Sequence, residues 1–109
     1  MVPKDFYKYE ADLLSDITAF LRKEMQACRC YYERRTAVGL SYRKGVPDLW
    51  FAKNGKHYEV ELKKTNGSRS TLQYHYERVF KLLNVEYACI NSWQQFLEFY
   101  HKDDEKEAP

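Results

Sequence analysis

The sequence predicts an α/β domain in which a mixed β-sheet is flanked by helices, in the order α-β-β-β-α-β-α. Three observations support this: apolar residues recur at helical spacing in three segments, an Asn-Gly pair separates two strand-like runs, and capping serines precede two of the helical segments. The chain has 109 residues, enough for one core with little left for a second. Its 44% hydrophobic and 31% charged content is typical of globular proteins.

The first predicted helix covers about residues 5–25. Its apolar residues recur at steps of three and four: Leu13, Ile17, Phe20, Leu21 and Met25. Residues 27–34 (ACRCYYER) predict a strand. Residues 35–46 contain two glycines and three basic residues and predict a loop.

Two strands are predicted next, at residues 48–52 and 57–63, on either side of an Asn-Gly turn. Asn-Gly between two strand-like runs is the strongest short-range signal for a β-hairpin. If Asn54 and Gly55 are the central turn residues, one register follows for the whole hairpin.

In this register Phe51 faces Tyr58 and Leu49 faces Val60, and with Leu62 they form one apolar face. Because side chains alternate along a strand, the other face carries Asp48, Trp50, Glu59, Glu61 and Lys63. The apolar face checks the register independently, since a slip of one residue would disrupt it.

The same register sets Asp48 opposite Glu61, with their Cβ atoms about 4.5–5.5 Å apart. Two carboxylates at that distance repel, and each raises the pKa of the other unless a positive charge lies between them. Lys63 can reach one of the two, and a divalent cation would neutralise both. The alternatives are a solvated polar face whose charges diverge, or Asp48 as a simple turn residue after Pro47.

The second half of the chain continues with a loop at residues 65–70 and then a helix. Ser70 with Gln73 forms a capping-box pattern at its start. Residues 85–90 (VEYACI) predict a strand, and Ser92 with Gln95 begins the last helix. The apolar residues of the first of these two helices form a stripe at helical spacing: Leu72, Tyr76, Val79 and Leu83. In the last helix we expect Trp93, Phe96, Leu97 and Tyr100 to face inward. Residues 101–109 (HKDDEKEAP) are acidic and lack apolar periodicity, so we expect a single domain over residues 1–100 and a disordered tail.

Positive charge is concentrated in the middle of the chain. Residues 29–81 carry 12 Lys or Arg and 5 Asp or Glu, against a net charge of only +2 overall. A basic middle indicates a polyanionic partner, with nucleic acid as the first candidate. The alternative is an ordinary solvated surface.

No apolar run approaches the length of a membrane span, and the first residues lack the apolar stretch of a signal peptide. We therefore expect a cytoplasmic protein without membrane contact.

The three cysteines do not indicate a disulfide framework or a zinc site. Their number is odd, and the three histidines are scattered rather than set at metal-ligand spacing. We therefore expect no zinc, and we interpret Cys28, Cys30 and Cys89 as small buried side chains with reduced thiols.

Pro47-Asp48, followed after 12 residues by Glu61-Leu62-Lys63, fits the PD-(D/E)xK pattern of restriction-endonuclease-like nucleases. The flanking sequences RKGVPDLWF and HYEVELKKTNGSRSTLQ closely resemble the VRR-NUC family within that superfamily. YEADLLSDITAFLR is similar to the family's first helix, and NVEYACINSWQQFLEF to its last strand and helix. The resemblance covers about residues 10–99 and is loosest at residues 27–44 and 65–70. It implies a restriction-endonuclease-like fold and a stand-alone, phage-type member, phage-encoded or from a bacterial host cell.

This resemblance implies roles for individual residues. Asp48 and Glu61 would be ligands of Mg²⁺ or Mn²⁺, with the main-chain carbonyl of Leu62 as a third. Lys63 would orient or help to deprotonate the attacking water, or offset charge at the phosphate; its alternative role is a plain surface lysine. Glu10 would reach the site directly or through a water molecule on the metal.

Two of these assignments have equally simple structural readings. Glu10 is also suited to complement the helix dipole, and Asp12 and Asp16 compete with it for the catalytic role. Gln73 occupies the position of a glutamine that the family keeps near its active site, but it also completes the capping box.

The implied reaction is metal-dependent hydrolysis of phosphodiester bonds in branched, Holliday-junction-like DNA, and symmetric cutting of two strands calls for a homodimer. No base-reading motif is apparent. The basic residues predicted to contact phosphates are Arg34, Arg35, Arg43, Lys44, Arg69 and Arg78. Two alternatives remain: a monomeric flap or nicking repair nuclease, and a non-catalytic nucleic-acid-binding module with the same fold.

Overall fold

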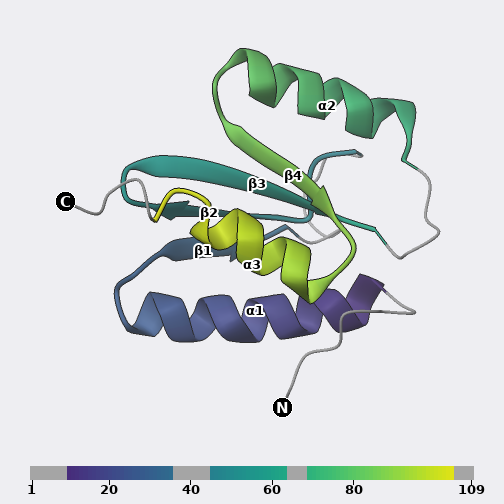
Figure 1. Ribbon diagram of the computed structural model, residues 1–109. Coiled ribbons are helices and arrows are strands. Elements are labelled where there is room, and N and C mark those ends of the chain that lie inside the picture. The colour runs from purple at the N-terminus through teal and green to yellow at the C-terminus, as the bar shows by residue number, and fades with distance from the viewer. Residues whose placement is uncertain (1–9, 36–44, 64–68, 105–109) are drawn as a thin grey trace.

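The computed structural model describes residues 10–35, 45–63 and 69–104. Helices and strands follow one another in these residues in the order predicted from the sequence, α-β-β-β-α-β-α (Figure 1). The elements are α1 (Glu10–Gln26), β1 (Tyr31–Arg34), β2 (Leu49–Lys53), β3 (Lys56–Leu62), α2 (Thr71–Leu82), β4 (Glu86–Ile90) and α3 (Trp93–His101).

The four strands form one mixed sheet in the order β1-β2-β3-β4. β1 is antiparallel to β2, and β2 to β3, whereas β4 is parallel to β3, which α2 makes possible as the crossover helix. The predicted hairpin register is confirmed, with Leu49 opposite Val60 and Phe51 opposite Tyr58. Asn54 and Gly55 have φ angles of 53° and 80°, the positive values that a tight two-residue hairpin turn requires.

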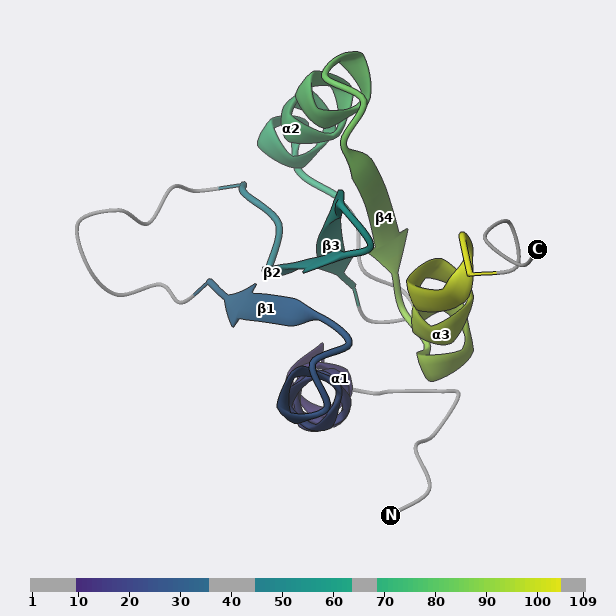
Figure 2. The same ribbon diagram turned by 90° about the vertical axis from the view of Figure 1, so that its left-hand side faces the viewer.

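The helices cover the sheet unequally. α1 and α3 lie together against one face, whereas α2 lies beside β4 on the other side (Figures 1 and 2). The core fills the space between the sheet and the helices α1 and α3; its buried side chains are Leu13, Ile17, Leu21, Leu49, Phe51, Tyr58, Val60, Leu62, Ile90, Phe96, Phe99 and Tyr100. α2 has no fully buried side chain. Among the described helices, none is both long and apolar enough to cross a membrane.

The connection from α1 to β1 differs from the prediction. The strand expected at residues 27–34 covers only Tyr31–Arg34, because the chain turns back at the end of α1. Cys28 adopts a left-handed φ of 59° there, and its N–H donates to the carbonyl of Met25. Cys28 is therefore exposed, which contradicts its interpretation as a buried side chain; Cys30 and Cys89 are partly buried, and all three thiols are free.

The folded domain extends beyond residue 100. α3 ends at His101, and residues 102–104 form a turn that packs on the hairpin. The Tyr58 hydroxyl donates to Asp103 Oδ2 at 3.0 Å, and Lys53 Nζ donates to Asp104 Oδ1 at 2.7 Å. Residues 101–104 of the predicted tail thus belong to the domain, whereas residues 105–109 lie outside the described residues.

Two glycines with positive φ provide a test of this geometry. A Cβ at Gly55 (φ 80°) would meet nothing within 4 Å, so Gly55→Ala costs only the backbone strain, about 1–2 kcal/mol. A Cβ at Gly45 (φ 87°) would lie 2.6 Å from the Cβ of Leu72 at the start of α2. We expect Gly45→Ala to cost about 1–3 kcal/mol more than Gly55→Ala, because overpacking adds to the strain. Urea denaturation of both variants measures the difference in stability. Equal losses of stability in the two variants would contradict the close approach of Gly45 to α2.

Candidate active site

The acidic pair lies where the hairpin ladder ends. The last paired residues are Leu49 and Val60, and beyond them the N–H of Asp48 donates to the carbonyl of Val60 at 2.9 Å. The N–H of Leu62 then donates to Asp48 Oδ2 at 2.7 Å, so a side-chain carboxylate takes the place of a main-chain acceptor. This fixes one oxygen of Asp48 against β3.

The side chains of Asp48 and Glu61 come together at this end of the hairpin, as the register predicted. The two carboxyls lie close enough for each to shift the pKa of the other. Glu61 is only 3% exposed. Its burial, together with the negative charge of Asp48, raises the pKa of Glu61 to about 8. Burial also raises the pKa of Asp48, although the Leu62 N–H opposes that shift. Near neutral pH Glu61 therefore holds a proton.

Gln73 contacts Glu61 directly. Its Nε2 donates to Glu61 Oε2 at 2.7 Å, while its Oε1 accepts a hydrogen bond from the Ser70 N–H at 2.8 Å. The capping box, completed by the Gln73 N–H and the Ser70 hydroxyl, is present as well. The two readings of Gln73 are thus compatible: the cap orients the amide so that its NH₂ group points at Glu61.

The other oxygen of Glu61 has no such partner. Oε1 is buried, and no N–H or O–H group of the described residues donates to it. A buried carboxylate oxygen without a donor is unfavourable and marks a place where a further group is expected to bind.

Lys63 and Glu10 act on the pair through their charges. The positive charge of Lys63 lowers the pKa of both Asp48 and Glu61, and the negative charge of Glu10, the first residue of α1, raises the pKa of Glu61. Within the described residues, no three His, Cys, Asp or Glu side chains lie close enough together to hold a metal ion. Glu10 therefore lies near the pair without forming a three-carboxylate cluster with it.

The main chain offers a third oxygen. The N–H of Leu62 points to Asp48, and the N–H of the next residue, Lys63, donates to the carbonyl of Ile90 in β4. Because the N–H and C=O of one strand residue point to the same side, the Leu62 carbonyl faces the Asp48 side rather than β4. Two carboxylates and one carbonyl are hard oxygen donors, and together with the partnerless Oε1 they fit a Mg²⁺ or Mn²⁺ ion.

Two of the arginines predicted to contact phosphates are engaged within the domain. Arg35 pairs with the buried carboxylate of Glu59 at 2.5 and 3.0 Å. The sequence placed Glu59 on the acidic face but gave no sign of this partner, which is 24 residues away along the chain.

Arg69 is held between α2 and β4. It pairs with Glu77 at 2.6 Å, donates to the Tyr87 hydroxyl at 2.8 Å and lies over the ring of Tyr74. Arg34 and Arg78 are exposed, whereas Arg43 and Lys44 lie outside the described residues. Arg34 is near enough to the acidic pair that its charge lowers the pKa of Asp48.

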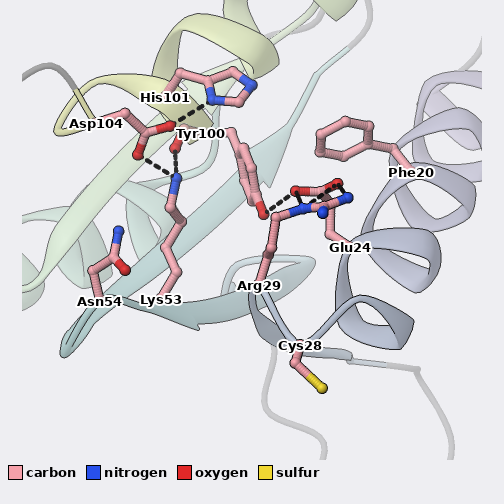
Figure 3. Close-up of a pocket in the computed structure, with 9 residues that line it drawn as sticks. All are labelled: Phe20, Glu24, Cys28, Arg29, Lys53, Asn54, Tyr100, His101 and Asp104. Carbon is pink, nitrogen blue, oxygen red and sulfur yellow. Dashed lines mark hydrogen bonds and ion pairs between the residues drawn. The ribbon is translucent and has the colours of Figure 1, made fainter.

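A cavity of about 630 Å³ lies at the other end of β2, between the hairpin turn, the end of α1 and the end of α3 (Figure 3). Its charged groups are already paired: Arg29 with Glu24 at 2.8 Å, and Lys53 with Asp104 at 2.7 Å. The cavity is thus separate from the acidic pair, and its charged groups pair with one another.

Comparison of the chain with models of protein families gives no match, and searches of curated proteins and of solved structures give none either. The resemblance to VRR-NUC nucleases therefore depends on the motifs themselves, and the activity it implies is a proposal.

The raised pKa of Glu61 predicts an unusual pH dependence of stability. Between a pKa of about 4.5 in the unfolded chain and about 8 in the folded protein, folding takes up a proton at Glu61. Glu61 therefore makes its whole contribution to the free energy of unfolding below pH 4.5, and this contribution is lost as the pH rises through 8. As the pH is raised from 5 to 8.5 in the presence of a chelator, we expect the free energy of unfolding of Glu61→Gln to increase by a few kcal/mol relative to that of the wild type.

Urea denaturation of both proteins across this pH range measures the difference. If the two stability curves run parallel from pH 5 to pH 8.5, Glu61 does not carry the proton.

Proposed function

We propose that this protein is a metal-dependent DNA endonuclease of the PD-(D/E)xK type, similar to the VRR-NUC family. The observation that carries the proposal is the pair of neighbouring carboxyls at Asp48 and Glu61, the latter with a buried oxygen that receives no hydrogen bond. Lys63 lies beside the pair on the same strand end. Acids packed together in this way destabilise the metal-free protein at neutral pH, and a divalent cation offsets that cost.

Asp48, Glu61 and the Leu62 carbonyl would hold Mg²⁺ or Mn²⁺. When bound, the ion supplies hydroxide from water near neutral pH and stabilises the negative charge that develops at the phosphate. Glu61 must release its proton before it can act as a ligand, so binding of the ion releases a proton from the protein. Gln73, which holds Glu61 Oε2, keeps the carboxylate in the orientation that presents Oε1.

Lys63 provides a fixed positive charge next to the reacting phosphate and orients the attacking water. Glu10, with its charge close to Glu61, would accept a hydrogen bond from water at the edge of the site. The exposed arginines Arg34 and Arg78 are the described candidates for contacts with DNA phosphates. Such contacts position a duplex without reading its sequence, which favours a structured substrate such as a branched junction. Symmetric cleavage of a junction requires two active sites, hence a homodimer.

Incubation of labelled four-way-junction DNA with the wild type and with Glu61→Ala tests the activity. We expect the wild type to cut only when Mg²⁺ or Mn²⁺ is present, and Glu61→Ala to be slower by on the order of 10³-fold, because it loses a metal ligand. Glu98→Ala, an exposed position on α3, is the matched control. A wild type that binds the junction but never cuts it with either ion is a binding module and not an enzyme.

The same substrate separates a junction resolvase from a flap or nicking nuclease. Paired incisions across the junction by a dimer, measured by incision mapping and size-exclusion mass, agree with the proposal. Single cuts on flaps by a monomer contradict it.

The two capping glutamines form a matched pair for testing Gln73. Gln95 accepts a hydrogen bond from the Asn91 N–H at 2.7 Å at the start of α3, as Gln73 does from Ser70 at the start of α2, but it has no link to Glu61. Each Gln→Ala change is expected to cost about 1 kcal/mol of stability through the lost cap. Only Gln73→Ala should also weaken Mn²⁺ binding, by about 10-fold or more, because it releases Glu61. Thermal denaturation and calorimetric titration measure the two effects; equal Mn²⁺ affinities in the two variants would rule out the role of Gln73 at the site.

A further inference from the structure

Arg35 donates hydrogen bonds to the main-chain carbonyls of both peptide bonds that flank Asp48. Its own N–H donates to the carbonyl of Asp48 at 2.8 Å, and its Nη1 donates to the carbonyl of Pro47 at 3.1 Å. Arg35 follows directly after β1, so these bonds continue the pairing of β1 with β2 beyond the last ladder pair, Arg34 and Leu49.

The guanidinium of Arg35 is itself held by a buried acid. Nη1 and Nη2 donate to the two carboxylate oxygens of Glu59 at 2.5 and 3.0 Å, a two-pronged arrangement that fixes the plane of the guanidinium. The Glu59 side chain is only 2% exposed, and His57 Nε2 lies 2.5 Å from its Oε2. Glu59 is on β3, two residues before Glu61, so the arrangement links the strand that carries Glu61 to the segment that carries Asp48.

These contacts leave Asp48 little freedom to move. Its N–H is bonded to Val60, its carbonyl to Arg35 and its Oδ2 to Leu62. Asp48 and Glu61 repel each other whenever both are ionised, and that repulsion pushes Asp48 away from β3. Moving Asp48 would break the Arg35 bonds and disturb a buried ion pair, which is costly because a buried charge would lose its partner.

We propose that Arg35, held by Glu59, is a positioning residue that keeps the Asp48 carboxylate beside Glu61, and not a contact to the DNA backbone. The role as it concerns metal binding rests on the proposed function. The anchoring of Asp48 in the metal-free protein does not.

Arg35→Lys tests the anchor while keeping a positive charge beside Glu59. A lysine cannot bond both Glu59 oxygens and the Pro47 carbonyl with fixed geometry. Arg29→Lys is the matched control, because Arg29 also forms a two-pronged pair, through Nε and Nη2, with Glu24 at the opposite end of β2. We expect Arg35→Lys to fold and to bind Mn²⁺ about 10-fold more weakly in calorimetric titration, and Arg29→Lys to bind it like the wild type.

A second readout needs no metal. The Leu62 N–H is protected by Asp48 Oδ2, so a displaced Asp48 exposes this amide to hydrogen exchange. We expect faster exchange at Leu62 in metal-free Arg35→Lys, with unchanged exchange at the centre of β3. Unchanged Leu62 exchange together with unchanged Mn²⁺ affinity would overturn the anchoring role.

The double variant Arg35→Gln, Glu59→Gln separates positioning from a phosphate contact, because it removes both charges without leaving either one buried alone. If Arg35 positions Asp48, Mn²⁺ affinity falls while the salt dependence of junction binding stays the same. A salt slope reduced by about one, with full Mn²⁺ affinity, assigns Arg35 to a phosphate and overturns the proposal. Absence of Mn²⁺ binding in the wild type would count against the proposed nuclease activity, and the Leu62 exchange would still decide the anchoring role.

Discussion

The contact between the carboxyls of Asp48 and Glu61 is the interaction on which the functional part of this domain depends. It is unfavourable by itself, since a buried acid and a partly buried acid lie side by side and one buried oxygen lacks a donor. It persists because neighbouring groups hold both side chains. The Leu62 N–H holds one carboxyl, and the Gln73 amide holds the other. Strain of this kind, concentrated at one point and supported from several elements, is characteristic of a site that binds or reacts.

The two faces of the sheet have different roles: one forms the apolar core, and the other carries the acidic side chains of the candidate site. The face toward α1 and α3 is apolar, and the rings of Phe51, Tyr58 and Phe96 pack there at centroid distances of 4.7 to 6.4 Å. The opposite face carries two buried acids: Glu59, whose charge is balanced by Arg35, and Glu61, which accepts a hydrogen bond from Gln73. α2, which has no fully buried side chain, contributes a capping amide to that face and little to the core. A helix held in this way is able to adjust to a ligand without disturbing the apolar layer.

Electrostatic compensation also explains which basic residues remain available. Arg35 and Arg69 are each bound by an acid and by further contacts within the domain, so their charge stabilises the fold around the site. Arg34 and Arg78 are exposed and free of the steric restriction that burial imposes. Net charge along the chain therefore overstates the charge that a polyanion would meet, because part of it is neutralised by neighbours that only the fold brings close.

The sequence by itself determined the order of the elements, the hairpin register and the neighbouring positions of Asp48 and Glu61. These follow from short-range rules: helical and strand periodicity, the positive φ of an Asn-Gly turn, and alternation along a strand. Only the tertiary structure decided the exposed turn at Cys28, the packing of residues 101–104 on the hairpin, and the pairing of Arg35 with Glu59. Those features join segments that are distant in the chain or depend on how one helix ends, and no local pattern encodes which charged side chain a buried acid will meet.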